Sequence, residues 1–515
     1  MPGVEAQTLA EGAAAGSTRD LSADIVSFTR HSSRRYNRSR TSFKDLFTDL
    51  YSYGLALGCA GALAVSVVIS VKDAITSRGA VGSVHISAHW PSIPAPALWT
   101  LIVYAALSAV MVLARRMGPI MVSGPEGQWW LPLPVDRRPM VLPPFLRRSI
   151  LSGFGAAAAF LPFSVLTSGH RTFPQHLLGS STFGAVTVVA VALAGLMQLG
   201  VVSPRLRRLA AAVALIPCAV LPSLTGSLWA LTLATLSAAL LLGVVASRAG
   251  QVRGADLIRG GAVAGHAQSS LFFMDTNELL RAFQGVRRIG SARRAARFYS
   301  RPARGPVSAL VRADTAAFLR LQPSLALPLS WLGVVIVTLL VDHGLPALAQ
   351  IGVIAIACCA VSSGAGTVAR QAALVPGLDS LLPISPPWGR ASRAFMPALA
   401  ISAWMTCLAG ILVLLGVAGP ALILLGALSG IGMGAGAVRC ATRPVSDWSV
   451  PPVETPFGPI PQAQIGSLLR GLDFTVLALA PALASIYTGD VRPAALIIQG
   501  LISAGTFGAV VLRSP

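Results

Sequence analysis

The chain has 515 residues, of which 54% are hydrophobic and only 11% are charged, and its mean hydropathy is +0.69. This composition excludes a string of soluble domains, because so few polar side chains cannot cover the surface of several soluble cores. The formal net charge is +21, but the basic residues lie between long apolar runs and not along one face. They therefore indicate membrane topology and not binding to nucleic acid.

The first segment, residues 1–41, is predicted to be a disordered cytoplasmic tail. An amphipathic stretch follows at residues 42–50, where apolar residues recur at three- and four-residue spacing and Ser42 with Asp45 forms a capping box. A similar amphipathic stretch occupies residues 309–320. Both stretches are expected to lie along the inner membrane interface without crossing the bilayer.

Twelve stretches are predicted to cross the bilayer, since about 20 apolar residues in a helix span a hydrocarbon core of about 30 Å. The fifth is short and contains Pro217, so it is also compatible with a re-entrant or kinked segment. We expect an all-α integral membrane protein with about twelve transmembrane helices arranged as two six-helix halves. The predicted spans are residues 50–71, 96–114, 149–168, 183–202, 209–221, 227–246, 325–341, 346–368, 395–416, 420–438, 472–487 and 493–512.

The placement of lysine and arginine orients the chain, because positive charge is retained on the cytoplasmic side of a membrane. If the amino terminus is inside, only four of the forty basic residues lie outside: Lys72, Arg78, Arg171 and Arg492. Both termini are therefore predicted to be cytoplasmic. The alanine- and arginine-rich, lysine-poor composition is typical of a high-GC bacterium, which predicts a multi-pass protein of a bacterial plasma membrane.

The sequence indicates an internal duplication, because similar segments recur in the same order in residues 42–247 and residues 307–515. A basic cytoplasmic linker, residues 248–306, joins these halves and is expected to be solvated and close to anionic lipid, with a specific binding function as the alternative. Glycines at GxxxG spacing predict close packing between helices, with a subunit interface as the alternative. These glycines are Gly54, Gly58, Gly426, Gly430 and Gly434.

The sequence carries no recognisable enzyme motif. A P-loop needs GxxxxGK followed by Ser or Thr, but Lys44 and Lys72, the two lysines of the chain, are each followed by Asp. The predicted spans are almost free of ionisable residues, and Asp473, at the inner edge of the eleventh span, is the nearest exception. No catalytic residue and no cofactor are therefore predicted.

Five of the seven histidines lie in segments that the topology puts outside. His85 and His89 are four residues apart and could share a metal if their segment were helical. No cysteine joins them and acidic residues nearby are few, so exposed polar side chains are the simpler interpretation and no metal site is predicted. The five histidines are His85, His89, His170, His176 and His343.

A proline-punctuated apolar turn recurs after the second span of each half. We call these turns, with the arginines that follow them, loop 1 (residues 129–138, WWLPLPVDRR) and loop 2 (residues 381–393, beginning LLPISP). An apolar turn on the inner face is poorly suited to remain in water alone, which predicts a docking surface. The alternative is a segment that rests on the membrane interface, where tryptophan and arginine are also favoured.

This pattern resembles the short cytoplasmic coupling segment of ATP-binding cassette (ABC) exporter permeases of the type-2 class. In that family each half has six spans, an amphipathic helix precedes the first span, and the loop between the second and third spans contacts a separate ATPase. The resemblance covers nearly the whole chain in architecture and implies a fused double permease driven by cytoplasmic ABC ATPase subunits. It implies ATPase contacts at Trp129, Trp130, Leu131, Pro132, Leu133, Arg137, Arg138, Leu381, Leu382, Pro383, Ile384, Arg390 and Arg393.

The two loops are not identical, since loop 2 has Trp388 after its turn and loop 1 has its tryptophan pair before the turn. The external loops also lack the large domain that some relatives of this class carry. The two ATPase contacts are therefore expected to be unequal.

Two other classes of function stay open. An ATP-independent secondary carrier or lipid flippase would place a charged or strongly polar residue inside the bundle, and its activity would track an ion gradient. A membrane-embedded enzyme acting on lipid-linked substrates would show acids, histidines or arginines converging at one membrane face. Membrane lipid is an expected partner in every case, and a further permease subunit is left open.

Overall fold

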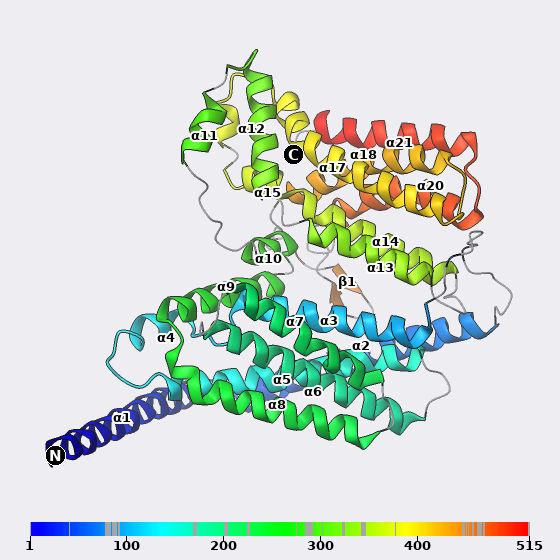
Figure 1. Cartoon of the computed structure of the whole chain (residues 1–515). Helices are drawn as coiled ribbons and strands as arrows, with labels where there is room; N and C mark the ends of the chain where they lie inside the picture. The colour runs from blue at the N-terminus through cyan, green and yellow to red at the C-terminus, as the bar shows by residue number, and fades with distance from the viewer. Residues whose placement is uncertain are drawn as a thin grey trace. The chain divides into compact units, whose positions relative to one another are not determined.

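The computed structural model consists of α-helices and one short hairpin in its described parts (Figure 1). The hairpin pairs strand β1 (Val453–Thr455) with strand β2 (Gly458–Ile460) in antiparallel register, with Val453 opposite Ile460. The structure describes residues 2–40, 42–77, 84, 90, 93–167, 172–199, 204–223, 227–273, 275–283, 292–300, 302–321, 325–340, 347–375, 377–444, 449, 451, 453–455, 458–460, 466 and 469–512.

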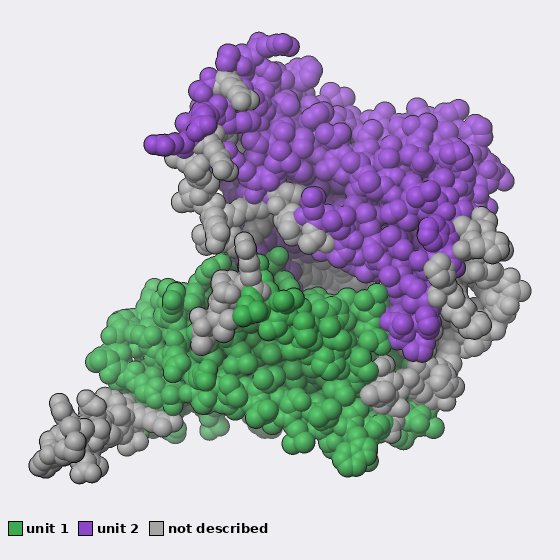
Figure 2. Space-filling model, viewed as in Figure 1, with its two compact units in different colours: residues 1–78, 99–269 green, residues 79–98, 270–515 purple. Residues whose placement is uncertain are grey.

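The chain forms two compact units (Figure 2). Unit 1 comprises residues 1–78 and 99–269, and unit 2 comprises residues 79–98 and 270–515. Up to the boundary near residue 270, the helices are α1 (Pro2–Arg40), α2 (Phe43–Ser77), α3 (Ala95–Met117), α4 (Gly124–Trp129), α5 (Arg138–Thr167), α6 (Phe173–Gln198), α7 (Pro204–Val220), α8 (Leu228–Arg248) and α9 (Gly254–Phe272), with short 3-10 turns at Leu221–Ser223 and Ala249–Gln251.

Unit 2 continues the chain to its end and also includes residues from before α3. The backbone N–H of Ile93 donates to the carbonyl of Leu340 at 2.7 Å, and the N–H of Val84 donates to Gln350 Oε1 at 2.9 Å. The helices of unit 2 are α10 (Thr276–Phe283), α11 (Ala292–Tyr299), α12 (Pro306–Leu321), α13 (Ala326–Leu339), α14 (Ala347–Ala365), α15 (Thr367–Ala372), α16 (Gly377–Ser380), α17 (Pro386–Leu414), α18 (Ala421–Ala441), α20 (Leu472–Thr488) and α21 (Pro493–Leu512).

Eight helices of the described chain are long and apolar enough to cross a membrane, which confirms a helical, multi-pass membrane protein. They are Pro96–Met117, Arg138–Val165, Phe173–Gln198, Leu228–Gln251, Ala347–Ala365, Pro386–Leu414, Ala421–Ala441 and Pro493–Leu512. Shorter apolar helices at Arg208–Val220, Leu327–Leu339 and Leu472–Thr488 coincide with three further predicted spans, and the first predicted span lies within α2.

Helix α6 lies at the centre of unit 1 and is its most buried candidate span. It packs against α5 where Gly153 and Gly184 face one another: a Cβ atom on Gly184 would lie 2.7 Å from the Gly153 carbonyl oxygen. Only glycine allows two backbones to approach this closely. Buried apolar side chains from α3, α5, α6 and α8 complete one continuous core around this contact.

Helix α18 holds the corresponding central place in unit 2, among α14, α17, α20 and α21 (Figure 1). Gly426, Gly430 and Gly434 face α17, and a Cβ on Gly430 would overlap the Cα of Ser402. Two further glycines of α18 face α20, where a Cβ on Gly432 would lie 2.7 Å from the Cβ of Ala478. The predicted role of the Gly426 series in helix packing is therefore confirmed within one chain, whereas a Cβ on Gly54 or Gly58 meets no atom within 4 Å.

Two segments differ from the sequence prediction. Residues 1–41, expected to be disordered, contain helix α1, whose alanine-rich first half has high helix propensity. Val26 on its second half is buried in the core of unit 1, so packing also supports this helix. The linker, residues 248–306, for which no helix was predicted, contains α9, α10 and α11, and the boundary between the units falls within it.

Candidate functional site

Loop 1 begins where α4 ends. Ser123 starts α4 with a capping box, in which the Ser123 hydroxyl accepts the Glu126 N–H and the Glu126 carboxylate accepts the Ser123 N–H at 2.9 Å. The helix ends at Trp129, whose side chain is 75% exposed. The sequence thus folds into an ordered support that presents one large aromatic side chain to the surroundings.

The predicted contact residues of loop 1 divide into two groups. Trp130 packs against the core of unit 1 and Leu131 belongs to that core, so both hold the loop down. Pro132 and Leu133 are exposed beside Trp129, and Arg137 and Arg138 are half-buried. The sequence alone did not distinguish Trp129 from Trp130, because nothing in two adjacent tryptophans says which one faces the core.

Helix α9 of the linker packs against the segment that directly precedes loop 1. The N–H of Val122 donates to the carbonyl of Leu257, and a Cβ on Gly261 would overlap the carbonyl oxygen of Val122. A Cβ on Gly127 in α4 would lie 3.2 Å from Ile258. Helix α9 therefore fits against the segment before loop 1 with room only for glycine at its closest point.

Loop 2 forms a tight turn between α16 and α17. The N–H of Leu382 donates to the Asp379 carbonyl at 3.2 Å, and the N–H of Ile384 donates to the Leu382 carbonyl at 2.8 Å. Helix α17 then begins at Pro386, with Ser385 as its N-cap and prolines in its first turn, where a missing N–H costs nothing. Leu381 is 78% exposed and Trp388 is 59% exposed, with Leu382 and Pro383 exposed between them, whereas Ile384 is half-buried.

Two arginines of loop 2 bind neighbouring segments of unit 2. Arg393 forms a two-pronged ion pair with Asp379, in which Nη1 donates to Oδ2 at 2.6 Å and Nη2 donates to Oδ1. Arg390 Nε donates to the carbonyl of Val511 at 2.9 Å. Arg390 and Arg393, which the sequence marked as partner contacts, are therefore engaged within the unit.

Asp314 of α12 accepts a hydrogen bond from the Ser392 hydroxyl at 2.6 Å. Burial raises the pKa of Asp314 above its ordinary value, although the hydrogen bond from Ser392 and the charge of Arg393 oppose this effect. Helix α12, predicted as an interfacial helix, is thus attached to the first turns of α17. Residues from α12, α16 and α17 together form the support of loop 2.

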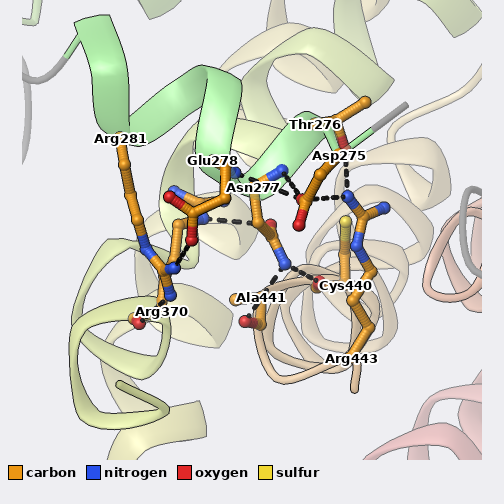
Figure 3. A network of polar contacts seen from close by, with 9 residues as sticks. All are labelled: Asp275, Thr276, Asn277, Glu278, Arg281, Arg370, Cys440, Ala441 and Arg443. Carbon is orange, nitrogen blue, oxygen red and sulfur yellow. Dashed lines mark hydrogen bonds and ion pairs between the residues drawn. The ribbon is translucent and has the colours of Figure 1, made fainter. Parts of the chain in front are cut away.

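A second polar cluster in unit 2 was not predicted as a site (Figure 3). It joins α10, α15 and the end of α18, and Asn277 of α10 is at its centre. Asn277 Nδ2 donates to the carbonyls of Cys440 at 3.0 Å and Ala441 at 3.4 Å, while Asn277 Oδ1 accepts from Arg370 Nε at 3.1 Å. Arg370 is only 1% exposed, and its Nη2 also donates to the carbonyl of Ser363.

The ends of α10 are bound to the same two segments. Arg281 Nη2 donates to the carbonyl of Arg370 at 2.8 Å, and Arg281 also pairs with Glu278. Arg443, just past α18, donates to Asp275 Oδ1 at 3.0 Å and to the Thr276 hydroxyl at 2.7 Å. Figure 3 shows these side chains converging from the three elements. The sequence DTNE at 275–278 is a helix-start signature that could have indicated α10, but nothing in it indicated the partners.

Charge is unevenly balanced in this cluster. Burial lowers the pKa of Arg370, and the nearby Arg281 and Arg443 act in the same direction. Burial acts to raise the pKa of Asp275, but hydrogen bonds from the amides of Glu278 and Asn277 and from Arg443 outweigh it, so the pKa of Asp275 lies below its ordinary value. No ion pair found among the described residues includes Arg370, so neutral oxygens hold its guanidinium.

The histidines give little support for a metal site. His85, His89, His170 and His343 lie outside the described residues. His176 is buried in unit 1, and its Nδ1 lies 2.9 Å from the Ser164 hydroxyl. In the described part of the chain, no group of three histidine, cysteine or acidic residues is placed to hold a metal ion.

Comparison with known protein families identifies the family of the chain. A family model described as "Family of unknown function (DUF6297)" matches residues 94–451, which is more than half of the chain. The match runs from the start of α3 to just before β1 and includes both loops and the Asn277 cluster. No curated protein and no solved structure matches the chain.

Proposed function

The chain belongs to the DUF6297 family, whose description assigns no activity, and we propose that it is the membrane-spanning permease of an ABC exporter. In this proposal a separate cytoplasmic ATPase supplies the energy and docks on loop 1 and loop 2. The chain itself carries no catalytic residue. Closure of two ATPase subunits on ATP would press on the loops, and the two halves would move to open a path for the substrate.

The proposal is supported chiefly by the exposed apolar side chains of the two loops. Each unit offers one apolar, proline-containing turn after the helix that contains its second predicted span. Trp129 in unit 1, and Leu381 and Trp388 in unit 2, extend exposed apolar surface from ordered supports. Exposed aromatic and leucine side chains on a fixed backbone are typical of protein docking sites, because little side-chain entropy is lost when a partner binds.

The proposal includes the complete topology. Twelve spans arise if the three shorter apolar helices and the apolar part of α2 cross the membrane together with the eight longer ones. Both termini then face the cytoplasm of a bacterium, and both loops face the ATPase. A duplication of six-span halves is supported by the matching positions of α6 and α18, which are the fourth predicted spans of their halves and the most buried.

One observation favours the alternative of an ATP-independent carrier. Gln499 of α21 is fully buried inside unit 2, where its Nε2 donates to the Ala478 carbonyl at 3.0 Å and to the Ser503 hydroxyl at 3.1 Å. Its Oε1 atom has no hydrogen-bond partner. Such an oxygen within an apolar bundle is suited to a polar substrate or ion, and a carrier of this kind would be driven by an ion gradient.

The permease proposal is tested by affinity purification of the full-length protein from its native host in mild detergent. The test variant carries Trp129→Ala, Leu381→Ala and Trp388→Ala, which removes exposed apolar side chains from both loops without disturbing the core. The matched control carries Trp90→Ala, Trp229→Ala and Leu348→Ala, which removes three exposed apolar side chains at positions predicted to lie on the outer side.

We expect an ABC ATPase, identified by mass spectrometry, to co-purify with the wild type and the control and to be lost from the test variant. ATP hydrolysis by the purified complex should follow the same pattern. An ATPase that binds all three proteins equally would remove the loops from the proposal. Absence of any ATPase, together with transport that collapses with the ion gradient, would favour the carrier.

A further inference from the structure

Helix α10 caps the ends of two other helices. The last carbonyl groups of a helix lack donors within their own helix and must find partners elsewhere. Asn277 donates to the carbonyls of Cys440 and Ala441 at the end of α18, and Arg281 donates to the carbonyl of Arg370 near the end of α15. Asn277 and Arg281 are four residues apart, so they project from one face of α10 and reach two helices at once.

Asn277 also links these two helices directly. Its Nδ2 binds α18 and its Oδ1 binds the guanidinium of Arg370, so one amide joins the end of α18 to α15, which directly follows α14. One more contact strengthens the link. Arg443, which follows α18, donates to Asp275, which directly precedes α10. Below this cluster, α15 and α18 meet through a small-residue contact, where a Cβ on Gly366 would lie 2.6 Å from the carbonyl oxygen of Ala437.

The cluster is suited to opening because its most buried charge, that of Arg370, forms no ion pair among the described residues. Arg370 is fully buried yet is held by the neutral oxygens of Asn277 and Ser363. A buried charge held in this way gives up much of its hydration, and water restores that hydration when the cluster opens. The terminal carbonyls of α15 and α18 also gain water on opening. Release of α10 is therefore opposed by lost hydrogen bonds and assisted by recovered solvation.

We propose that α10 is a latch: Asp275, Asn277 and Arg281 hold the adjoining ends of α15 and α18 together, and these ends separate when α10 is released. Helix α10 belongs to the segment that joins the two halves of the chain. A pull on that segment is therefore transmitted to α18 and, through α15, to α14. The latch does not depend on an ATPase partner and applies equally to a gradient-driven carrier.

The test is hydrogen–deuterium exchange of the full-length protein in lipid nanodiscs, read by mass spectrometry. Two peptides report the latch: residues 366–375, where the Arg370 N–H is bonded to Gly366, and residues 438–444, where the Thr442 N–H is bonded to Val438. Residues 425–436 in the middle of α18 report the stability of the whole unit. In the wild type, both latch peptides should exchange with opening constants that agree within about threefold, since one event exposes both.

Two substitutions of Asn277 distinguish its two arms, which are the hydrogen bonds of Nδ2 to α18 and the hydrogen bond of Oδ1 to Arg370. Asn277→Ala removes both arms, so exchange in both latch peptides should rise about tenfold. Asn277→Asp keeps an oxygen for Arg370 but loses the donors to α18 and places a negative charge beside its carbonyls. With the bonds to α18 lost and the bond to Arg370 kept, the end of α18 no longer opens together with α15 in this variant, so exchange should rise in residues 438–444 and stay near the wild-type rate in residues 366–375. Gln268→Ala, which removes an exposed amide from the same linker, is the control and should change neither peptide.

Three results would overturn the latch. Unchanged exchange in both peptides of Asn277→Ala would show that other contacts hold the two ends. An equal rise in residues 425–436 would show that Asn277 supports the whole unit and not a local opening. Wild-type opening constants that differ more than about tenfold between the two latch peptides would show that the ends open separately.

Discussion

Loop 1 and loop 2 carry the same kinds of residue but are held in place by different means. Loop 1 lies on its own half-buried Trp130 and buried Leu131 and on α9, a helix that begins more than one hundred residues later. Loop 2 is held chiefly by polar contacts within unit 2, which are the ion pair of Arg393 with Asp379 and the hydrogen bond from Ser392 to Asp314. Apolar packing positions one loop and charge positions the other.

The difference has a physical consequence for how each loop responds to change. Close packing against glycine tolerates almost no added volume, so the position of loop 1 is set sharply by shape. A charged pair that is partly exposed is weaker and depends on pH and salt, so the position of loop 2 is adjustable. The three predictions that follow test this contrast, in order of expected effect.

The largest effect is expected for Gly261→Ala in α9. The added Cβ would overlap the Val122 carbonyl, so α9 must shift away from the segment before loop 1 at a cost of about 1–3 kcal/mol or more. Gly265→Ala, one turn later in the same helix, meets no atom within 4 Å and should gain up to about 1 kcal/mol from helix propensity. Thermal unfolding in detergent should place the two variants on opposite sides of the wild type, and equal shifts would contradict the packing of α9 described above.

A smaller, local effect is expected for Arg393→Ala. Loss of the ion pair leaves Asp379 half-exposed and should destabilise the turn by about 1–2 kcal/mol, reduced from the value for a buried pair because water reaches Asp379. Chymotrypsin should therefore cut after Leu381 or Trp388 roughly five- to thirtyfold faster than in the wild type.

Arg492→Ala, which breaks an exposed pair with Asp490 at 4.0 Å, is the control for this experiment and should leave cleavage unchanged. The melting temperature of Arg393→Ala should stay close to that of the wild type. If the melting temperature falls as much as it does in Gly261→Ala, loop 2 is not locally supported and the contrast between the loops fails.

The smallest effect is expected for Asp314→Asn, which keeps an oxygen for the Ser392 hydroxyl but cannot ionise. Because the pKa of Asp314 is raised in the folded protein, its stabilisation is present below the ordinary value of 3.8 and is lost as the pH rises through the raised pKa. At pH 7.5 the variant should melt at the same temperature or about 1–3 °C higher than the wild type. At pH 4 the advantage should disappear, and an advantage that persists would contradict a raised pKa.

Much of the fold could be predicted from the sequence because hydrophobic runs of membrane length have few other uses. Every predicted span coincides at least in part with a helix, and the two loops lie between the expected helices. The boundaries were less accurate at loop 2, where α17 begins at Pro386 and includes the predicted contacts Arg390 and Arg393. Proline in a first helical turn is as compatible with a helix start as with a turn.

The details of the site could not be predicted, because they depend on partners far apart in the chain. Asn277 is one polar residue in a linker dominated by arginine and glycine, and its partners lie 93 and 163 residues away. Gly261 resembles any glycine of a flexible segment until Val122 is placed beside it. Periodicity indicates which face of a helix is apolar but not which distant residue meets it.

The pairing of residues 79–98 with unit 2 bears on how such a chain can evolve. The segment ends within the first turn of α3, most of which belongs to unit 1, yet Val84 and Ile93 are bonded to Gln350 and Leu340. A recombination that exchanged the first half of this chain for that of a distant relative would also replace a piece of the second unit. Inheritance of the halves is therefore coupled: substitutions near Leu340 and Gln350 are expected to co-vary with those in residues 79–98.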